Sequence, residues 1–219
     1  MTGPRLLPVR TPSSPEGVVL VLHGGAHRGE QAMVSPAQLS VLRMVPVAHR
    51  IARAGRSRLA VHRVLNSHRG WDSGTTPVMD AAWAIGQVRA AHGDLPISLV
   101  GHSLGGRAAL LAGDDPHVVS VVALNPWVLP TDRVDLTGTR VLVVHGTDDR
   151  IALPSRSADL ARRVSAGFVS VPGAKHAMLR HGRTFETYAA DFVTATLLGD
   201  GPRTPAVREV LGGAAFVDG

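Results

Sequence analysis

The chain of 219 residues contains no cysteine, and no stretch of it approaches the ~20 apolar residues that a membrane-spanning helix requires. Without cysteine, disulfide bonds and thiolate zinc sites are excluded. Residues 1–17 contain prolines and no apolar run of signal-peptide length, so we expect no cleaved export signal. These absences predict a cytoplasmic protein that does not act at a membrane.

Lysine is almost absent, since Lys175 is the one lysine among 23 basic side chains, and aromatic residues make up 4% of the chain. Arginines therefore carry the formal net charge of +6, and they are scattered along the sequence. Proteins that bind nucleic acids gather basic residues into a patch or stripe. The scattered pattern predicts no nucleic-acid partner.

Short apolar runs rich in valine alternate with longer stretches of helical spacing, in a chain whose length fits one domain. We predict strands at residues 18–22, 59–65, 97–100, 118–124, 141–144 and 168–171. Continuous apolar strands separated by helices indicate an α/β fold, with a parallel sheet covered on both faces. We expect one domain at residues 17–199, an N-terminal segment at 1–16 and a weakly patterned C-terminal tail at 200–219.

A serine stands in a sharp turn between the third predicted strand and the helix that follows it. The turn has the pattern G-x-S-x-G and reads Gly101-His102-Ser103-Leu104-Gly105. In this context the serine hydroxyl points out of the sheet, and the glycines avoid collisions with neighbouring elements. The helix that begins after the serine aims its first N–H groups at the site, where they favour negative charge. The pattern therefore predicts Ser103 as a nucleophile.

This turn resembles the nucleophile elbow of the α/β-hydrolase superfamily, in which an acid and then a histidine follow the serine along the chain. A later segment resembles the family's H-G-x-x-D segment and reads His145-Gly146-Thr147-Asp148-Asp149. By this resemblance Asp149 is the acid, and Asp148 stays open as the alternative. The resemblance also places the general base at His176, in the loop before the last predicted helix.

A serine hydrolase needs N–H donors for the oxyanion that forms when a carbonyl is attacked. The resemblance assigns one donor to the backbone of Leu104, the residue after the nucleophile. The second donor should follow the first core strand, where the chain resembles the family's H-G-G segment and reads His23-Gly24-Gly25. We assign this donor to Gly25, with Ala26 as the alternative.

The resemblance covers residues 18–198 and implies an α/β-hydrolase fold with about six mostly parallel strands. Many relatives carry a helical lid before the strand that precedes the acid, but only about 15 residues separate Leu124 from Arg140 here. We therefore expect no inserted lid domain and an open site. Whether residues 29–46 cover the site stays open.

Substrate-binding residues are predicted on loops at the same edge of the sheet as the serine. Trp71 stands where the family often has an aromatic residue, and Trp127 lies on another such loop. Two tryptophans at one pocket would favour an apolar or aromatic acyl group. Arg28 and Met33 are further candidates for the pocket wall. The eleven histidines show no H-E-x-x-H or similar spacing, so we predict no metal site and no cofactor.

The function that these residues favour is hydrolysis of a carboxylic ester or thioester with a small or medium acyl group, through an acyl-enzyme. The partner of such an enzyme is a small ester-like molecule. Two alternatives stay open. The same three residues would also serve catalysis on an amide, a C–C bond or a biosynthetic intermediate, and a ligand-binding protein can keep this fold without activity. The sequence does not fix the oligomeric state.

Overall fold

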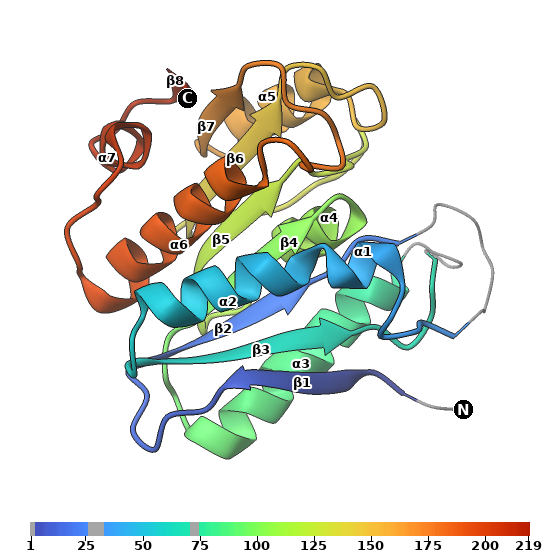
Figure 1. Cartoon of the computed structure of the whole chain (residues 1–219), viewed down its shortest axis with the longest axis vertical. Coiled ribbons are helices and arrows are strands. Elements are labelled where there is room, and N and C mark those ends of the chain that lie inside the picture. Colours follow the sequence, from blue (N-terminus) through green and yellow to red (C-terminus); the bar gives the residue numbers. More distant parts are fainter. Residues whose placement is uncertain (1–2, 26–32, 71–74) are drawn as a thin grey trace.

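The computed structural model describes residues 3–25, 33–70 and 75–219, and within them a single sheet of eight strands forms the centre of the molecule (Figure 1). The strand order is β1-β3-β2-β4-β5-β6-β7-β8. Only β1 is antiparallel to its neighbour, so the sheet is mostly parallel. The strands are β1 (Arg5–Arg10), β2 (Gly17–Leu22), β3 (Leu59–Leu65), β4 (Ile97–His102), β5 (Val118–Leu124), β6 (Arg140–Gly146), β7 (Gly167–Val171) and β8 (Phe216–Asp218).

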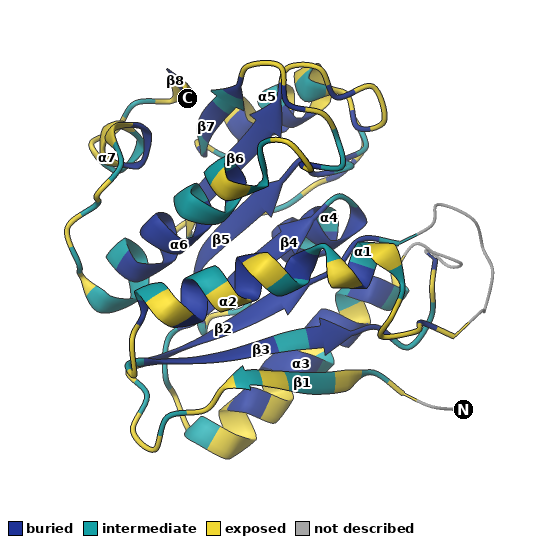
Figure 2. Cartoon of the chain, in the orientation of Figure 1, coloured by how far each residue is buried: buried dark blue, intermediate teal, exposed yellow. Residues whose placement is uncertain are grey.

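The central strands are apolar along their whole length because both of their faces are buried (Figure 2). In β2, Val18, Leu20 and Leu22 belong to one hydrophobic core, whereas Val19 and Val21 belong to the core on the opposite face. Successive side chains of a strand point to opposite faces, so a continuous apolar run serves two cores. This pattern confirms the α/β architecture predicted from the valine-rich runs.

Helices cover both faces of the sheet. Residues of α2 (Met44–Ala54), α6 (Gly182–Leu198) and α7 (Pro205–Leu211) pack in one core. Residues of α3 (Thr76–His92), α4 (Leu104–Leu111) and α5 (Pro154–Arg163) pack in the other. A short helix, α1 (Leu39–Leu42), precedes α2, and the break between them falls at Arg43. Pro46 lies in the first turn of α2, where a missing backbone N–H costs no hydrogen bond.

Strands at residues 5–10 and 216–218, within the segment and the tail expected at residues 1–16 and 200–219, join the sheet at its two edges. Strand β1 pairs antiparallel with β3 at one edge, and its register shifts after Pro8. Proline is tolerated at such an edge because one side of the strand has no partner. At the other edge β8 pairs parallel with β7, and α7 packs beside it. The sheet therefore has eight strands rather than about six.

Residues 125–139, all of which are described, connect β5 to β6 without a helix or a strand. The short connection leaves no lid domain at this place, as the sequence predicted. The loops that follow β2, β4, β5, β6 and β7 leave the same edge of the sheet, since these strands are parallel. Ligands of open α/β sheets bind at that edge. None of the described helices has the length and apolar character that a bilayer-spanning segment needs.

Candidate active site

Ser103 occupies a strained turn between β4 and α4. Its φ of 56° and ψ of −122° place a residue with a side chain in a region that L-residues rarely adopt. The two flanking glycines of the motif are required by close packing. A Cβ on Gly101 would lie 2.1 Å from the carbonyl oxygen of Gly105, and a Cβ on Gly105 would lie 2.4 Å from that of His23. The G-x-S-x-G pattern therefore fits the backbone that holds Ser103 outside the sheet.

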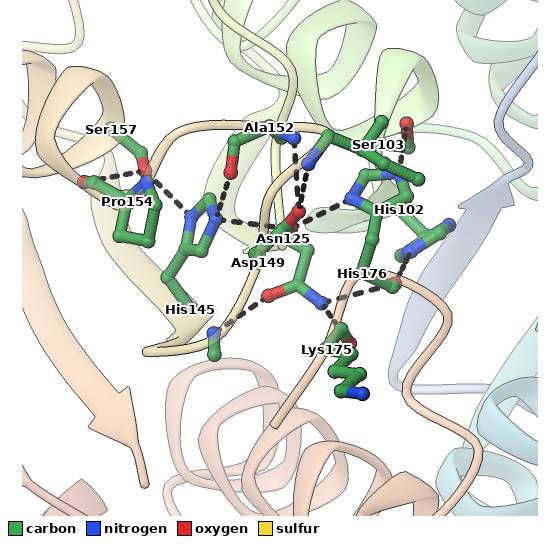
Figure 3. Close-up of polar contacts among 12 residues, drawn as sticks. His102, Ser103, Asn125, His145, Asp149, Ala152, Pro154, Ser157, Lys175 and His176 are labelled. Atoms are coloured by element: carbon green, nitrogen blue, oxygen red, sulfur yellow. Dashed lines mark hydrogen bonds and ion pairs between the residues drawn. The ribbon is translucent and has the colours of Figure 1, made fainter. Parts of the chain in front are cut away.

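Three side chains from separate loops form one chain of hydrogen bonds (Figure 3). The Oγ of Ser103 lies 2.9 Å from Nε2 of His176. The Nδ1 of the same imidazole lies 2.7 Å from Oδ2 of Asp149. Asp149 is buried, whereas the neighbouring Asp148 is exposed. Of the two carboxylates that the sequence left open, the structure thus brings Asp149 to His176.

Asp149 is held as a carboxylate by several donors. Its Oδ1 accepts hydrogen bonds from the backbone N–H groups of Ile151 and Ala152, both at 2.9 Å. Its Oδ2 also lies 3.2 Å from Nε2 of His145. Burial alone would raise the pKa of Asp149, but hydrogen bonds from His145, His176 and the Ala152 N–H outweigh burial and lower it below its ordinary value. The carboxylate therefore stays charged behind His176 through the neutral range.

His145 is itself fixed by its surroundings. The ring is fully buried, and Nδ1 lies 2.6 Å from the hydroxyl of Ser157 at the start of α5. The Nε2 lies 3.0 Å from the carbonyl oxygen of Ala152, which can only accept, so Nε2 carries a proton. That proton is shared between the carbonyl and Asp149. His145 therefore orients the carboxylate from the side opposite His176.

Two residues that the sequence analysis did not assign to the site hold the backbone of His176. The amide Nδ2 of Asn125 donates to the carbonyl oxygens of Lys175 and His176, at 3.2 and 3.1 Å. The Nε2 of His102 donates to the same His176 carbonyl at 2.8 Å. Both side chains are buried, and Asn125 has a φ of 41°. The one sequence signal for Asn125 is a polar residue directly after an apolar core strand.

His102 is neutral in the folded protein. Burial, followed by the nearby His176, lowers the pKa of His102 to about 3. Because Nε2 donates to a carbonyl, Nδ1 carries the lone pair, and among the described residues it has no hydrogen-bond partner. The ring centroids of His102 and His176 lie 5.0 Å apart. A neutral ring at this distance adds no positive charge beside His176.

The loop after β2 lies directly against the serine. A Cβ on Gly24 would lie 3.2 Å from Cβ of Ser103, and one on Gly25 would lie 2.4 Å from the carbonyl oxygen of Arg69. The buried His23 fixes this loop, since its Nε2 accepts from the backbone N–H of Asn66 at 3.2 Å. Its Nδ1 then carries the proton and lies 2.6 Å from the carbonyl oxygen of Gly24. Burial lowers the pKa of His23 as well, so this ring is also neutral.

A cavity of about 280 Å³ opens over Ser103 and His176. Of the predicted residues, Leu104 and Gly25 line it, and so does Trp127, whose backbone N–H donates to the carbonyl of Ser103 at 3.1 Å. The other lining residues described are Gly24, Ser40, Arg43, His102 and Ile151. Ser40 and Arg43 come from residues 29–46, so part of this segment forms a wall of the site.

Some residues that the sequence predicted for the oxyanion hole or the substrate pocket are not among the described residues that line this cavity. Met33 is 65% exposed, pairs with His68 and is not among the described residues that line the cavity. Ala26, Arg28 and Trp71 lie outside the described residues. Across the described ranges no group of three or more histidine, aspartate or glutamate side chains is arranged to hold a metal ion.

Comparison with known proteins finds similarity at the level of three-dimensional structure and none at the level of sequence. No protein-family model matches the chain, and no curated protein matches its sequence. Ferulic-acid-bound Est1E from Butyrivibrio proteoclasticus superposes with a TM-score of 0.69 at 15% identity, over 89% of this chain and 96% of that one. An α/β serine hydrolase homologue from Coxiella burnetii gives a TM-score of 0.66 at 19% identity, over 87% and 93%.

A further solved structure bears on the missing lid. A lidless α/β serine hydrolase from Xanthomonas campestris superposes with a TM-score of 0.61 at 19% identity, over 94% of this chain and 98% of that one. The superposition covers most of both chains, so the likeness extends over the fold and is not confined to one part of it. Together with the strand order and the elbow, these likenesses establish that the chain has the α/β-hydrolase fold.

Proposed function

We propose that the protein is a serine hydrolase that cleaves a carboxylic ester or thioester of a small or medium acyl group. The observation that carries this proposal is the continuous hydrogen-bonded chain from Ser103 through His176 to the buried Asp149. A serine hydroxyl becomes a competent nucleophile when an adjacent base takes its proton and a third group orients that base. The three side chains have this arrangement at the sheet edge where ligands bind.

The reaction follows from the positions of these atoms. Ser103 Oγ attacks the carbonyl carbon of the ester while His176 Nε2 takes its proton, and Asp149 stabilises the imidazolium that forms. His176 then gives the proton to the leaving alkoxide or thiolate, which departs and leaves an acyl-enzyme. A water molecule repeats the sequence on the acyl group, and the carboxylic acid is released. Asn125 and His102 support the step because they fix the backbone from which His176 extends.

The oxyanion is assigned to the backbone N–H groups of Leu104 and Gly25. Leu104 is the first residue of α4, where N–H groups have no partner within the helix and the helix dipole favours negative charge. Gly25 also lines the cavity, on the loop that packs against Ser103. Two donors on fixed backbone need no reorganisation when charge develops on the carbonyl oxygen.

The cavity supports the choice of substrate class. Its volume of about 280 Å³ is at the small end for ligand sites, which favours short or medium acyl groups. Trp127 and Ile151 supply apolar surface beside the serine. Est1E, the structural relative from Butyrivibrio, binds an aromatic acid in its own structure, and Trp127 would suit an aromatic acyl group here. Trp71, Arg28 and the cytoplasmic location stay predictions.

A fluorophosphonate probe tests the proposal, because it labels only an activated serine. We expect one adduct, located by mass spectrometry on Ser103, and no adduct in Ser103→Ala. The same two proteins should be compared on p-nitrophenyl esters of increasing acyl length and on acyl-CoA thioesters. The variant should lose activity while its circular dichroism and unfolding transition stay those of a folded protein. Labelling at another residue, or full activity in Ser103→Ala, would reject the proposal.

A further inference from the structure

Arg43 brings a positive charge to the cavity that contains Ser103. It lies between α1 and α2 and lines the cavity together with Ser103 and His176. Among the described residues that line this cavity, Arg43 is the one arginine, and no aspartate or glutamate is present. The cavity wall therefore carries a cation without a facing carboxylate from the described part of the chain.

The guanidinium of Arg43 is partly buried. Its Nε is inaccessible to solvent and has no hydrogen-bond partner among the described residues. Burial also lowers the pKa of Arg43. A buried polar N–H that stays unpaired costs free energy, and a charged group costs more. Such a group in a binding cavity is therefore poised to gain hydrogen bonds when an acceptor arrives.

Two carboxylates in the described part of the chain lie near Arg43 or His176, and both are engaged by other groups. Glu186 lines an adjoining apolar groove with Arg43, but it pairs with Arg50 at 3.6 Å. Asp149 lies behind His176 and is committed to the hydrogen bonds described above. The charge of Arg43 acts on His102, which also lines the cavity, because it contributes to the lowered pKa of that ring. With the N-terminus of α4 at the same place, the cavity favours an anion.

We propose that Arg43 binds a carboxylate of the substrate, so that the preferred substrates are anionic esters or thioesters. The inference rests on the proposed function and narrows its substrate class. A planar guanidinium offers a fork of N–H donors that matches the two oxygens of a carboxylate. The bond would hold the substrate while the ester carbonyl lies at Ser103. The carboxylate that Arg43 binds can belong to the acyl half or to the alcohol half of the ester. Two pairs of substrates distinguish these two cases.

The first pair places the charge on the acyl half, with mono-4-nitrophenyl adipate compared with its neutral N-methyl amide. The second pair places it on the alcohol half, with 4-acetoxybenzoate compared with its methyl ester. The quantity measured is the ratio of kcat/KM for the anionic ester to that for its neutral partner. In the wild type we expect this ratio to exceed one in one of the pairs.

Variants of the arginine give the decisive comparison. Arg43→Gln should lower the ratio tenfold to a hundredfold in that pair, and Arg43→Lys should retain part of it because the charge remains without the fork. Arg53→Gln is the matched control, since Arg53 is exposed on α2, the helix that follows Arg43, and does not line the cavity. It should keep the wild-type ratio. A ratio that Arg43→Gln leaves unchanged in both pairs overturns the inference while ester hydrolysis itself stands.

Binding measured without turnover separates this inference from the proposed function. Benzoate is titrated into the wild type, Arg43→Gln and Arg53→Gln, and binding is followed by NMR shifts of backbone amides around the cavity. We expect Arg43→Gln alone to weaken the binding at least tenfold. If no ester is cleaved and Ser103 takes no probe, but benzoate binds through Arg43, the proposed hydrolysis is wrong and the anion site remains. Equal benzoate affinity in all three proteins overturns the anion site.

Discussion

Acidification should destabilise this protein through His102, and the effect can be worked out from the structure. The buried ring keeps a pKa of about 3 in the folded state, against an ordinary value of 6.5 that applies once the chain unfolds. Below pH 6.5 the unfolded chain therefore binds a proton at this position that the folded protein does not. Stability from this residue is fully present above pH 6.5 and is lost as the pH falls from there toward 3.

The magnitude follows from the width of that window. Each pH unit between the two pKa values corresponds to about 1.4 kcal/mol. Between pH 8 and pH 5 the protein crosses 1.5 units of the window, so His102 alone should lower the free energy of unfolding by about 2 kcal/mol. This is a large fraction of the stability of a typical domain, about 5–15 kcal/mol.

Urea denaturation at pH 8 and pH 5 measures the effect, with His102→Gln as the variant and His49→Gln as the control. Glutamine keeps an N–H donor for the His176 carbonyl but cannot titrate, whereas His49 is exposed on α2. The difference in unfolding free energy between the two pH values should shrink by about 2 kcal/mol in His102→Gln. His49→Gln should keep the wild-type difference, and His23, which stays in all three proteins, cancels. An unchanged pH dependence in His102→Gln would refute the reasoning.

Three further predictions concern activity. Asp149→Asn should lower kcat on the order of 10⁴-fold by favouring the wrong tautomer of His176, whereas Asp148→Asn should have little effect; the reverse order would mean that the acid is misassigned. Because the cavity is small and residues 125–139 form no lid, kcat/KM along an acyl series from two to sixteen carbons should peak at short or medium chains. Trp127→Ala should then lower kcat/KM for aromatic or medium acyl groups, which corresponds to a loss of about 1–3 kcal/mol of transition-state binding. A maximum at sixteen carbons would contradict both statements.

The positions of Ser103, Asp149 and His176 could be predicted from sequence because each follows a core strand at the same edge of the sheet. Parallel strands bring their carboxyl ends together, so chain order and strand pattern suffice to gather these residues. The backbone of the elbow also leaves a sequence signature, since a Cβ at Gly101 or Gly105 would collide with a main-chain carbonyl.

The supporting residues could not be found in this way. Asn125 and His102 donate to a main-chain carbonyl that lies 51 and 74 positions away along the chain. A carbonyl is present at every residue, so the acceptor leaves no pattern in residue type. Arg43 stood within a segment whose place relative to the site could not be inferred, because helical spacing gives the existence of a helix and not its packing.

The two edge strands, β1 and β8, also could not be predicted from the sequence. Strand β8 has three residues, too few to show an alternating or continuous apolar pattern. Strand β1 contains Pro8, and a proline argues against a strand in a sequence pattern unless the strand is known to lie at an edge of the sheet. The central strands were predictable because both of their faces are buried, whereas edge strands depend on tertiary packing that a local pattern does not encode.

The unusual backbone of Ser103 has a consequence for the choice of an inactive reference protein. Conformations of this kind cost a side-chain-bearing residue on the order of 1–3 kcal/mol, and glycine adopts them with little strain. Alanine at this position keeps the strain and removes only the hydroxyl, whereas glycine removes both. This strain lowers the stability of the native protein, so Ser103→Gly should melt at a higher temperature than the wild type. The difference in Tm between the glycine and alanine variants reports the strain relieved at this pair of dihedral angles, less the conformational entropy that glycine adds to the unfolded chain.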